Sequence, residues 1–192
     1  MTTTDKRRTI LKALEKVLKD QRYDEVTVDE VAEAAGVGKG TVYRYFEDKE
    51  DLFFQMIQEF LSEESDAVSV VAAAAMPPRE KLVRIGETIS KHIQLHGRYI
   101  RMMHAQHNSQ RQGRDPHETM RNHHQRLDRI LAQVLRDAEN TGLLRPNLDY
   151  EAVLCLYKGM IMESSMCFLH MDITVSLEQL VDLILAGVGQ PN

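Results

Sequence analysis

Apolar residues recur with a helical period along nearly the whole chain, and this repetition restricts the fold more than any other feature. In the first such segment, Ile10, Leu11, Leu14 and Leu18 fall on one side of a helix. No stretch alternates apolar and polar residues as a half-buried strand would. We therefore predict an all-α protein with about nine helices.

Glycines and prolines divide the chain into the expected helices. Gly36 and Gly38 separate two short helices, Pro77 ends a long one, and Gly97 and Gly142 close two others. After the first helix, the expected helices are residues 28–35, 39–46, 49–75, 79–95, 99–107, 117–140, 150–170 and 175–188. We place a domain boundary after residue 48, so that residues 1–48 form a small N-terminal domain and residues 49–192 a larger C-terminal one.

The composition favours a globular protein with a core. Of 192 residues, 43% are hydrophobic and 28% are charged. No apolar run reaches the roughly 18 residues of a membrane span, and the first residues lack the apolar block of a secretory signal. Cys155 and Cys167 have no CxxC neighbour. We therefore expect no disulfide, two buried unreactive thiols and a cytoplasmic location.

Residues 26–53 predict two short helices joined by a glycine turn. Thr27 and Glu30 match a capping box at the start of the first of these helices. In the second, Val42 and Phe46 lie four residues apart, which predicts its buried side. Proteins that place a helix in the major groove of DNA often use this helix-turn-helix layout.

The second short helix would then present its other side to DNA. The Arg44 guanidinium could donate two hydrogen bonds to a guanine edge, whereas Lys39, Tyr43, Tyr45 and Lys49 suit phosphate oxygens. Gly40 would permit a close approach of the backbone. The full set of candidate DNA contacts is Arg7, Thr27, Lys39, Gly40, Thr41, Tyr43, Arg44, Tyr45 and Lys49.

An alternative interpretation is a basic, solvated helix that lies between two core helices without binding DNA. Overall charge does not exclude it, because residues 1–50 hold ten basic and eleven acidic residues and carry a net charge of −1. DNA binding would require the basic side chains to gather on one face.

The residues themselves are more specific than their spacing. VTVDEVAEAAGVGKGTVYRYFEDKEDLF, residues 26–53, resembles the DNA-binding signature of the TetR family of bacterial repressors. Gly38 departs from the serine that is common there, which removes a capping hydroxyl. GLLRPNLDYEAV, residues 142–153, is similar to the family's turn into its eighth helix. The resemblance implies a cytoplasmic homodimer whose two heads bind palindromic double-stranded operator DNA until a small-molecule ligand in the C-terminal domain releases it.

The last two expected helices are apolar on more than one side. Such helices must be buried on more than one side, and self-association around a two-fold axis would bury them. The alternative is that one side meets the core and the rest is ordinary exposed apolar surface. The family resemblance implies the same dimer contact.

Methionines and aromatic residues late in the chain suggest an adaptable apolar ligand pocket, although core packing explains any one of them equally well. The candidate ligand-binding residues are Tyr99, Met102, Met103, Arg121, Tyr157, Met160 and Met166. The arginines of residues 98–136 could instead clamp an anionic ligand through Arg98, Arg101 and Arg121. Alternatively, they pair at the surface with acidic residues of the fourth helix, which are Glu59, Glu63, Glu64 and Asp66.

Histidine pairs raise the possibility of a metal site. His92 and His96, His104 and His107, and His117 and His124 have helical spacings that could chelate Zn²⁺, Cu²⁺ or Ni²⁺. No carboxylate or cysteine is placed to complete a ligand set, so we expect no metal and no cofactor. The chain also lacks a nucleophile elbow, a phosphate loop and an HExxH motif. We therefore expect no catalytic residues, and a metal-dependent enzyme or a helical interaction protein is the alternative function.

Overall fold

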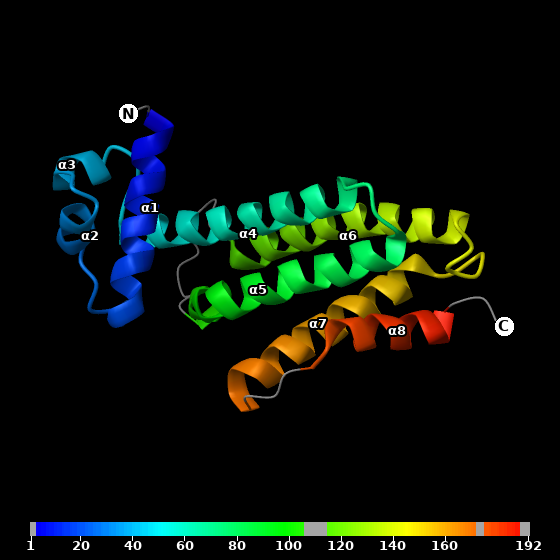
Figure 1. The fold of residues 1–192 in the computed structure, drawn as a ribbon. Helices are drawn as coiled ribbons and strands as arrows, with labels where there is room; N and C mark the ends of the chain where they lie inside the picture. The colour runs from blue at the N-terminus through cyan, green and yellow to red at the C-terminus, as the bar shows by residue number, and fades with distance from the viewer. Residues whose placement is uncertain (1–2, 106–114, 172–174, 189–192) are drawn as a thin grey trace. The chain divides into compact units, whose positions relative to one another are not determined.

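The computed structural model describes residues 3–105, 115–171 and 175–188. These residues form eight α-helices and no strand (Figure 1). The helices are α1 (Thr3–Asp20), α2 (Val28–Ala34), α3 (Lys39–Val42), α4 (Lys49–Ala73), α5 (Pro78–Ala105), α6 (Pro116–Asn140), α7 (Tyr150–Met171) and α8 (Leu177–Val188). The all-α prediction is confirmed. No helix in the described ranges is long and apolar enough to span a bilayer.

The eight helices agree with the prediction of about nine, and the difference of one arises because α5 continues through Gly97, where the sequence suggested an end. A glycine inside a helix costs only about 1 kcal/mol. Around Gly97, the position of a Cβ would lie 3.6 Å from Ile93 Cγ2 and 3.5 Å from Arg101 Nη1. Side chains from the same helix therefore cover the glycine, and Ile89 and Tyr99 on either side of it are buried. Packing of the flanking residues overrides the local preference.

The chain forms two compact units, and along the sequence the boundary between them falls within α4. One contains residues 1–60, and the other contains residues 61–105 and 116–192. The first part of α4, up to Phe60, therefore packs with α1, α2 and α3. This division by packing lies twelve residues beyond the functional boundary expected after residue 48.

The core of the first unit joins α1, α2, α3 and the start of α4. Ile10 and Leu14 of α1 are fully buried, and Val31 of α2 is 1% exposed. The Tyr23 ring lies 4.8 Å from the Phe53 ring, centroid to centroid. Within this unit α1 packs against α2, and α2 packs in turn against α3.

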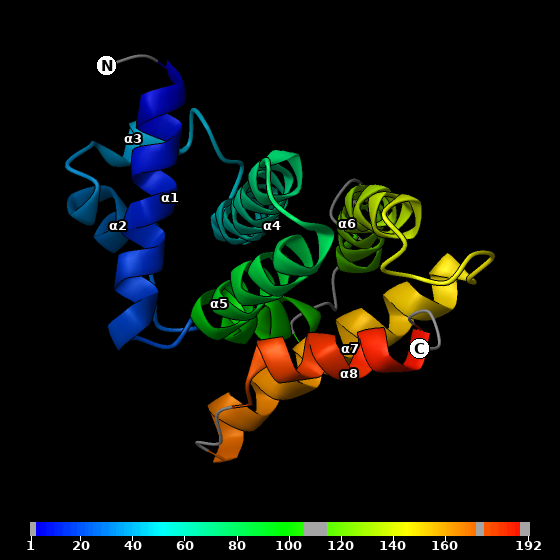
Figure 2. The same cartoon turned by 45° about the vertical axis from the view of Figure 1, so that its right-hand side comes forward.

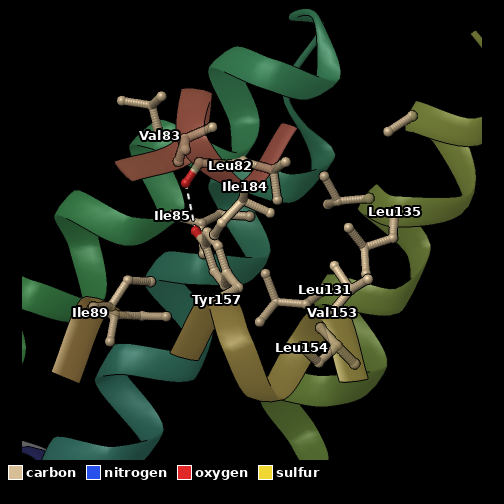
Figure 3. Close-up of a cluster of buried hydrophobic side chains, with 14 of the residues drawn as sticks. Leu82, Val83, Ile85, Ile89, Leu131, Leu135, Val153, Leu154, Tyr157 and Ile184 are labelled. Carbon is tan, nitrogen blue, oxygen red and sulfur yellow. Dashed lines mark hydrogen bonds between the residues drawn. The ribbon is translucent and has the colours of Figure 1, made fainter. Parts of the chain in front are cut away.

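The core of the second unit is built around α5, which packs against α6, α7 and α8 (Figures 1 and 2). Figure 3 shows Leu131 and Leu135 of α6 facing Val153 and Leu154 of α7. Among them lies Tyr157, whose hydroxyl donates a 2.5 Å hydrogen bond to the Leu82 carbonyl of α5. Burial raises the pKa of Tyr157 far above its ordinary value. Tyr157 therefore joins α7 to α5 as a neutral core residue.

Candidate nucleic-acid interface and ligand cavity

The capping box predicted from sequence starts α2. The Thr27 backbone N–H donates to Glu30 Oε2 at 2.7 Å, and the Glu30 N–H donates to Thr27 Oγ1 at 3.3 Å. The bond from the Thr27 N–H to the carboxylate contributes most to holding the pKa of Glu30 below its ordinary value, and a bond from the Thr27 hydroxyl to the same oxygen adds to it. Thr27, a candidate DNA contact, thus has a structural role in fixing the start of α2.

The turn between α2 and α3 depends on Gly36, which adopts φ +66°. Its N–H donates to the Glu33 carbonyl at 3.0 Å, and the Val37 N–H donates to the Ala32 carbonyl at 2.9 Å. This pair of bonds is a Schellman motif, which ends α2 and turns the chain toward α3. Gly38 then precedes α3 in an extended conformation without a side-chain cap.

The regular part of α3 is only one turn, Lys39–Val42, and residues 43–45 continue in a turn. This is shorter than the expected residues 39–46. Its inner side is the predicted one, since Val42 is 1% and Phe46 is 2% exposed. On the other side Gly40 and Arg44 are exposed, and Tyr43 is 49% exposed.

Arg44 stands out among the charged residues of this segment. Its side chain makes no hydrogen bond or ion pair with any residue that the structure describes. Thr41 and Tyr45 are half-buried beside it. The free guanidinium can therefore donate its fork of hydrogen bonds to an outside partner.

Two other candidate DNA contacts, Lys39 and Lys49, already have partners inside the first unit. Lys39 Nζ lies 2.6 Å from Asp29 Oδ2 of α2. This hydrogen bond raises the pKa of Lys39. Lys49 Nζ donates to the Tyr23 and Val26 carbonyls at 3.1 and 3.0 Å, above the Tyr23 ring.

Arg7 is held in the same way by α4. Its Nη2 donates to Gln55 Oε1 at 2.9 Å, and its Nη1 lies 3.4 Å from Glu59 Oε2. The neighbouring Arg8 pairs with the other oxygen of Glu59 at 2.9 Å. Arg7 and Lys49 therefore stabilise the unit, which sequence spacing alone did not indicate.

In the second unit, α4, α5, α6 and α7 surround a cavity of about 220 Å³. Three methionines and five leucine or isoleucine residues make most of its wall apolar. The cavity is lined by Leu61, Glu64, Ile89, Ile93, Gly97, Ile100, Arg101, Met120, His123, His124, Leu127, Lys158, Met162 and Met166. Its composition suits a mainly apolar ligand.

Of the candidate ligand-binding residues, Met166 lines this cavity. The others do not belong to its wall. Tyr99 and Met103 are buried in the protein, and Tyr157 lies in the core of the second unit. Met160 packs against that core. Met102 is half-buried on α5, and Arg121 is exposed on α6.

The polar residues of the cavity were not predicted from the sequence. Glu64, which we considered as a surface partner for arginines, is 6% exposed, and His123 is 8% exposed. Glu64 Oε1 lies 3.6 Å from His123 Nε2, and His123 Nδ1 lies 3.2 Å from Ser65 Oγ. Desolvation lowers the pKa of the adjacent His124, and the charge of His123 adds to this effect. Of the suggested acidic partners, Asp66 pairs with an arginine of α6, its Oδ1 lying 2.6 Å from Arg126 Nη2.

The last two helices expose apolar side chains. Leu156 of α7 is 50% exposed and Leu183 of α8 is 65% exposed. Cys155 is a free, exposed thiol, contrary to the expected burial, because its side of α7 faces away from the core. Gly159 is exposed nearby, and a Cβ there would meet nothing within 4 Å. An apolar surface with small residues is thus left for another partner.

The histidine pairs form no metal site in the described part of the chain. No group of three or more His, Cys, Asp or Glu residues there could hold a metal ion. His92 and His96 are close, with ring centroids 6.0 Å apart. The His104 side chain and His107, like the Cys167 side chain, lie outside the described residues.

Two short helices, a glycine turn and an outward-facing arginine define the N-terminal unit as a helix-turn-helix of the DNA-binding class. Residues 10–56 match the sequence model of the family described as bacterial regulatory proteins, tetR family. Over these residues the chain is similar to the DNA-binding part of TetR-family bacterial regulators.

Sequence similarity to a curated relative covers less than half of the chain, whereas similarity of fold to solved structures covers nearly all of it. The chain is 34% identical to the HTH-type transcriptional regulator YhgD of Bacillus subtilis over 80 residues, and these 80 residues are 42% of each chain. The match therefore spans less than half the length of that relative.

Two solved structures share the fold of nearly the whole chain. A TetR-family regulator from Mesorhizobium loti has a TM-score of 0.77 at 20% identity, over 99% of this chain and 100% of that one. The transcriptional regulator FadR from Bacillus subtilis, in complex with stearoyl-CoA, has a TM-score of 0.67 at 20% identity, over 93% of this chain and 95% of that one. At these identities the likeness establishes a common fold.

Proposed function

We propose that this protein is a transcriptional repressor that binds a palindromic operator as a homodimer and is released from it by a small-molecule effector. The observation that carries the proposal is Arg44, whose unpaired guanidinium lies in the turn that follows α3, between the buried Val42 and Phe46. An exposed arginine with free donors can recognise guanine in the major groove. In this proposal residues 1–48 bind DNA, and residues 49–192 bind the effector and form the dimer, as the sequence predicted.

The remaining DNA contacts set position rather than sequence. Thr41, Tyr43 and Tyr45 surround Arg44 and can reach phosphate oxygens, and Gly40 allows the backbone to approach. Lys39 can bind a phosphate if its ion pair with Asp29 breaks. We assign Arg7, Thr27 and Lys49 to holding this surface in place, through the internal bonds described above.

The effector would occupy the cavity between α4, α5, α6 and α7. Its methionines favour an apolar body. An anionic group could bind Arg101, because the other cationic lining residue, Lys158, already pairs with Asp128 at 2.5 Å. The acyl thioester bound by FadR combines these two properties.

Dimerisation would bury the exposed side of α7 and α8. Leu156 and Leu183 supply apolar surface, and Gly159 permits close helix approach. A two-fold contact would use the same surface on both copies. We further propose a cytoplasmic, non-enzymatic protein, because operator binding and effector release require no covalent chemistry.

Selection from random DNA duplexes tests the DNA-binding proposal. The purified protein is incubated with the library at moderate salt, and bound duplexes are sequenced. We expect enrichment of two inverted half-sites about one helical turn apart. Uniform, salt-sensitive binding without enrichment, with and without stearoyl-CoA, would contradict operator recognition.

Release of the selected duplex then tests the effector. Stearoyl-CoA is added to the complex, with free coenzyme A as the control. Release by the acyl thioester alone supports an effector with an apolar chain. Equal release by both molecules, or by neither, excludes this class.

A further inference from the structure

The cavity of the second unit contains a carboxylate that the described part of the chain does not satisfy. The Glu64 side chain is only 8% exposed, and its closest ionic partner, His123 Nε2, lies 3.6 Å from Oε1. That separation is longer than a hydrogen bond. Within the described ranges, no group donates a hydrogen bond to either Glu64 oxygen. Since Glu64 lines the cavity, a donor that enters the cavity can reach these oxygens and satisfy them.

Ser65 fixes the orientation of the His123 ring. In this orientation the ring cannot donate hydrogen bonds to both Glu64 oxygens. The Ser65 hydroxyl donates to the Leu61 carbonyl at 3.0 Å, and a carbonyl can only accept. His123 Nδ1, 3.2 Å from Ser65 Oγ, is therefore the donor in that contact. In the neutral ring, Nε2 then carries no proton and is itself an acceptor beside Glu64. In the charged ring, Nε2–H faces a single Glu64 oxygen, and the other oxygen still has no donor.

The cationic residues of the wall do not supply the missing donor. Lys158 Nζ is bound to Asp128 Oδ1 at 2.5 Å. Arg101 Nη1 lies 3.5 Å from the Cβ position of Gly97, one turn back along α5, so its guanidinium lies along its own helix. Around the carboxylate, the wall otherwise includes Met120 and Met162. The cavity thus combines an acceptor with an apolar surface.

We propose that Glu64 binds a hydrogen-bond donor of the effector, an amine or a hydroxyl group, while the apolar body of the effector packs against the methionines. This inference rests on the proposed role of the cavity as the effector site. It adds a second polar position to the anionic one at Arg101. An effector that has both an apolar chain and a donor group would use each part of the wall.

Direct binding of three eight-carbon probes to the full-length protein tests this assignment. Octylammonium and 1-octanol carry a donor, whereas octanoate carries only acceptors at neutral pH. Binding is measured by calorimetry, without DNA, for the wild type and for Glu64→Gln. Glu63→Gln, the neighbouring residue on α4 that is not part of the wall, removes the same charge and is the matched control.

We expect Glu64→Gln to weaken octylammonium binding about tenfold or more, the loss of one charged hydrogen bond. A smaller loss is expected for 1-octanol, and octanoate should bind equally well or more tightly. Glu63→Gln should change none of the three. A larger loss for 1-octanol than for octylammonium would identify a hydroxyl as the natural donor and also supports the assignment.

Equal changes for all probes in Glu64→Gln, or no binding of any octyl probe to the wild type, would overturn the proposal. Circular dichroism separates these outcomes from misfolding, since glutamine has nearly the shape of glutamate. The readout does not involve DNA. It can therefore fail while operator selection succeeds, and it can succeed while operator selection fails.

Discussion

Lys39 Nζ lies 2.6 Å from Asp29 Oδ2, so an ion pair joins α3 to α2 on the side of the unit that we expect to meet DNA. Both side chains are more than half exposed, at 51% and 64%. An exposed pair of this kind contributes little to stability. Its greater effect should be on DNA binding, because Asp29 competes with phosphate for Lys39 and also repels phosphate.

Replacement of Asp29 by Asn should therefore tighten DNA binding. We expect a gain of roughly threefold at low salt that shrinks as salt is raised, since both effects are electrostatic. The measurement is a titration of labelled duplex at several salt concentrations. Asp24→Asn removes an acidic residue elsewhere in the unit and is the control. Weaker binding of Asp29→Asn would show that the ion pair positions Lys39 productively.

The capping box should make the free energy of unfolding depend on pH in the acidic range. The Glu30 pKa is lower in the folded protein than its ordinary value of 4.5. A lowered folded pKa means that the contribution is fully present above about pH 4.5 and is lost as pH falls through the folded value. We expect Glu30→Gln to be less stable than the wild type near neutral pH and to match it in strong acid. Denaturation curves across this range provide the test, with Glu33→Gln on the same helix as the control. A stability difference that persists unchanged in acid would contradict the assignment.

Two glycines of the helix-turn-helix should respond oppositely to alanine. At Gly36, φ is +66°, so Gly36→Ala should lower the free energy of unfolding by about 1 kcal/mol. Gly40 lies within α3 with open space at its Cβ position, so Gly40→Ala should raise it by about 0.5–1 kcal/mol. Urea unfolding without DNA measures both variants. Stabilisation by Gly36→Ala would exclude the left-handed turn.

The apolar side of α8 should control the oligomeric state. Leu183 is 65% exposed, and Leu183→Glu would place a charge in the proposed dimer contact. We expect light scattering to show a dimer for the wild type and a monomer for the variant, with unchanged helix content. Val70→Glu, at a position of α4 that is 72% exposed, should leave the dimer intact. A monomeric wild type, or a dimeric Leu183→Glu, would place the dimer contact elsewhere.

The sequence predicted the helix-turn-helix well because its signals are local. The capping box of Thr27 and Glu30, the turn at Gly36 and the buried pair Val42 and Phe46 each depend on residues a few positions apart. The TetR resemblance, carried by the same residues, is confirmed. Only the extent of α3 was overestimated.

The cavity was harder to predict because its wall joins four helices. Nothing local distinguishes Met166, which lines it, from Met102 and Met103, which do not. Glu64 lies among acidic neighbours and looked like a surface residue, yet its side of α4 is the one turned toward His123. The internal partner of Lys49 was hidden for the same reason, since the Tyr23 and Val26 carbonyls lie more than twenty residues earlier in the chain.

The most direct test of the account is the sequence discrimination of Arg44→Ala. Its affinity for the selected duplex is compared with that for the same duplex in which each half-site guanine is replaced. We expect the wild type to discriminate and the variant to lose about 1–3 kcal/mol of discrimination, while Arg22→Ala, an arginine 80% exposed elsewhere in the unit, behaves as the wild type. If Arg44→Ala discriminates as well as the wild type, the helix-turn-helix does not read DNA through Arg44, and the central claim is wrong.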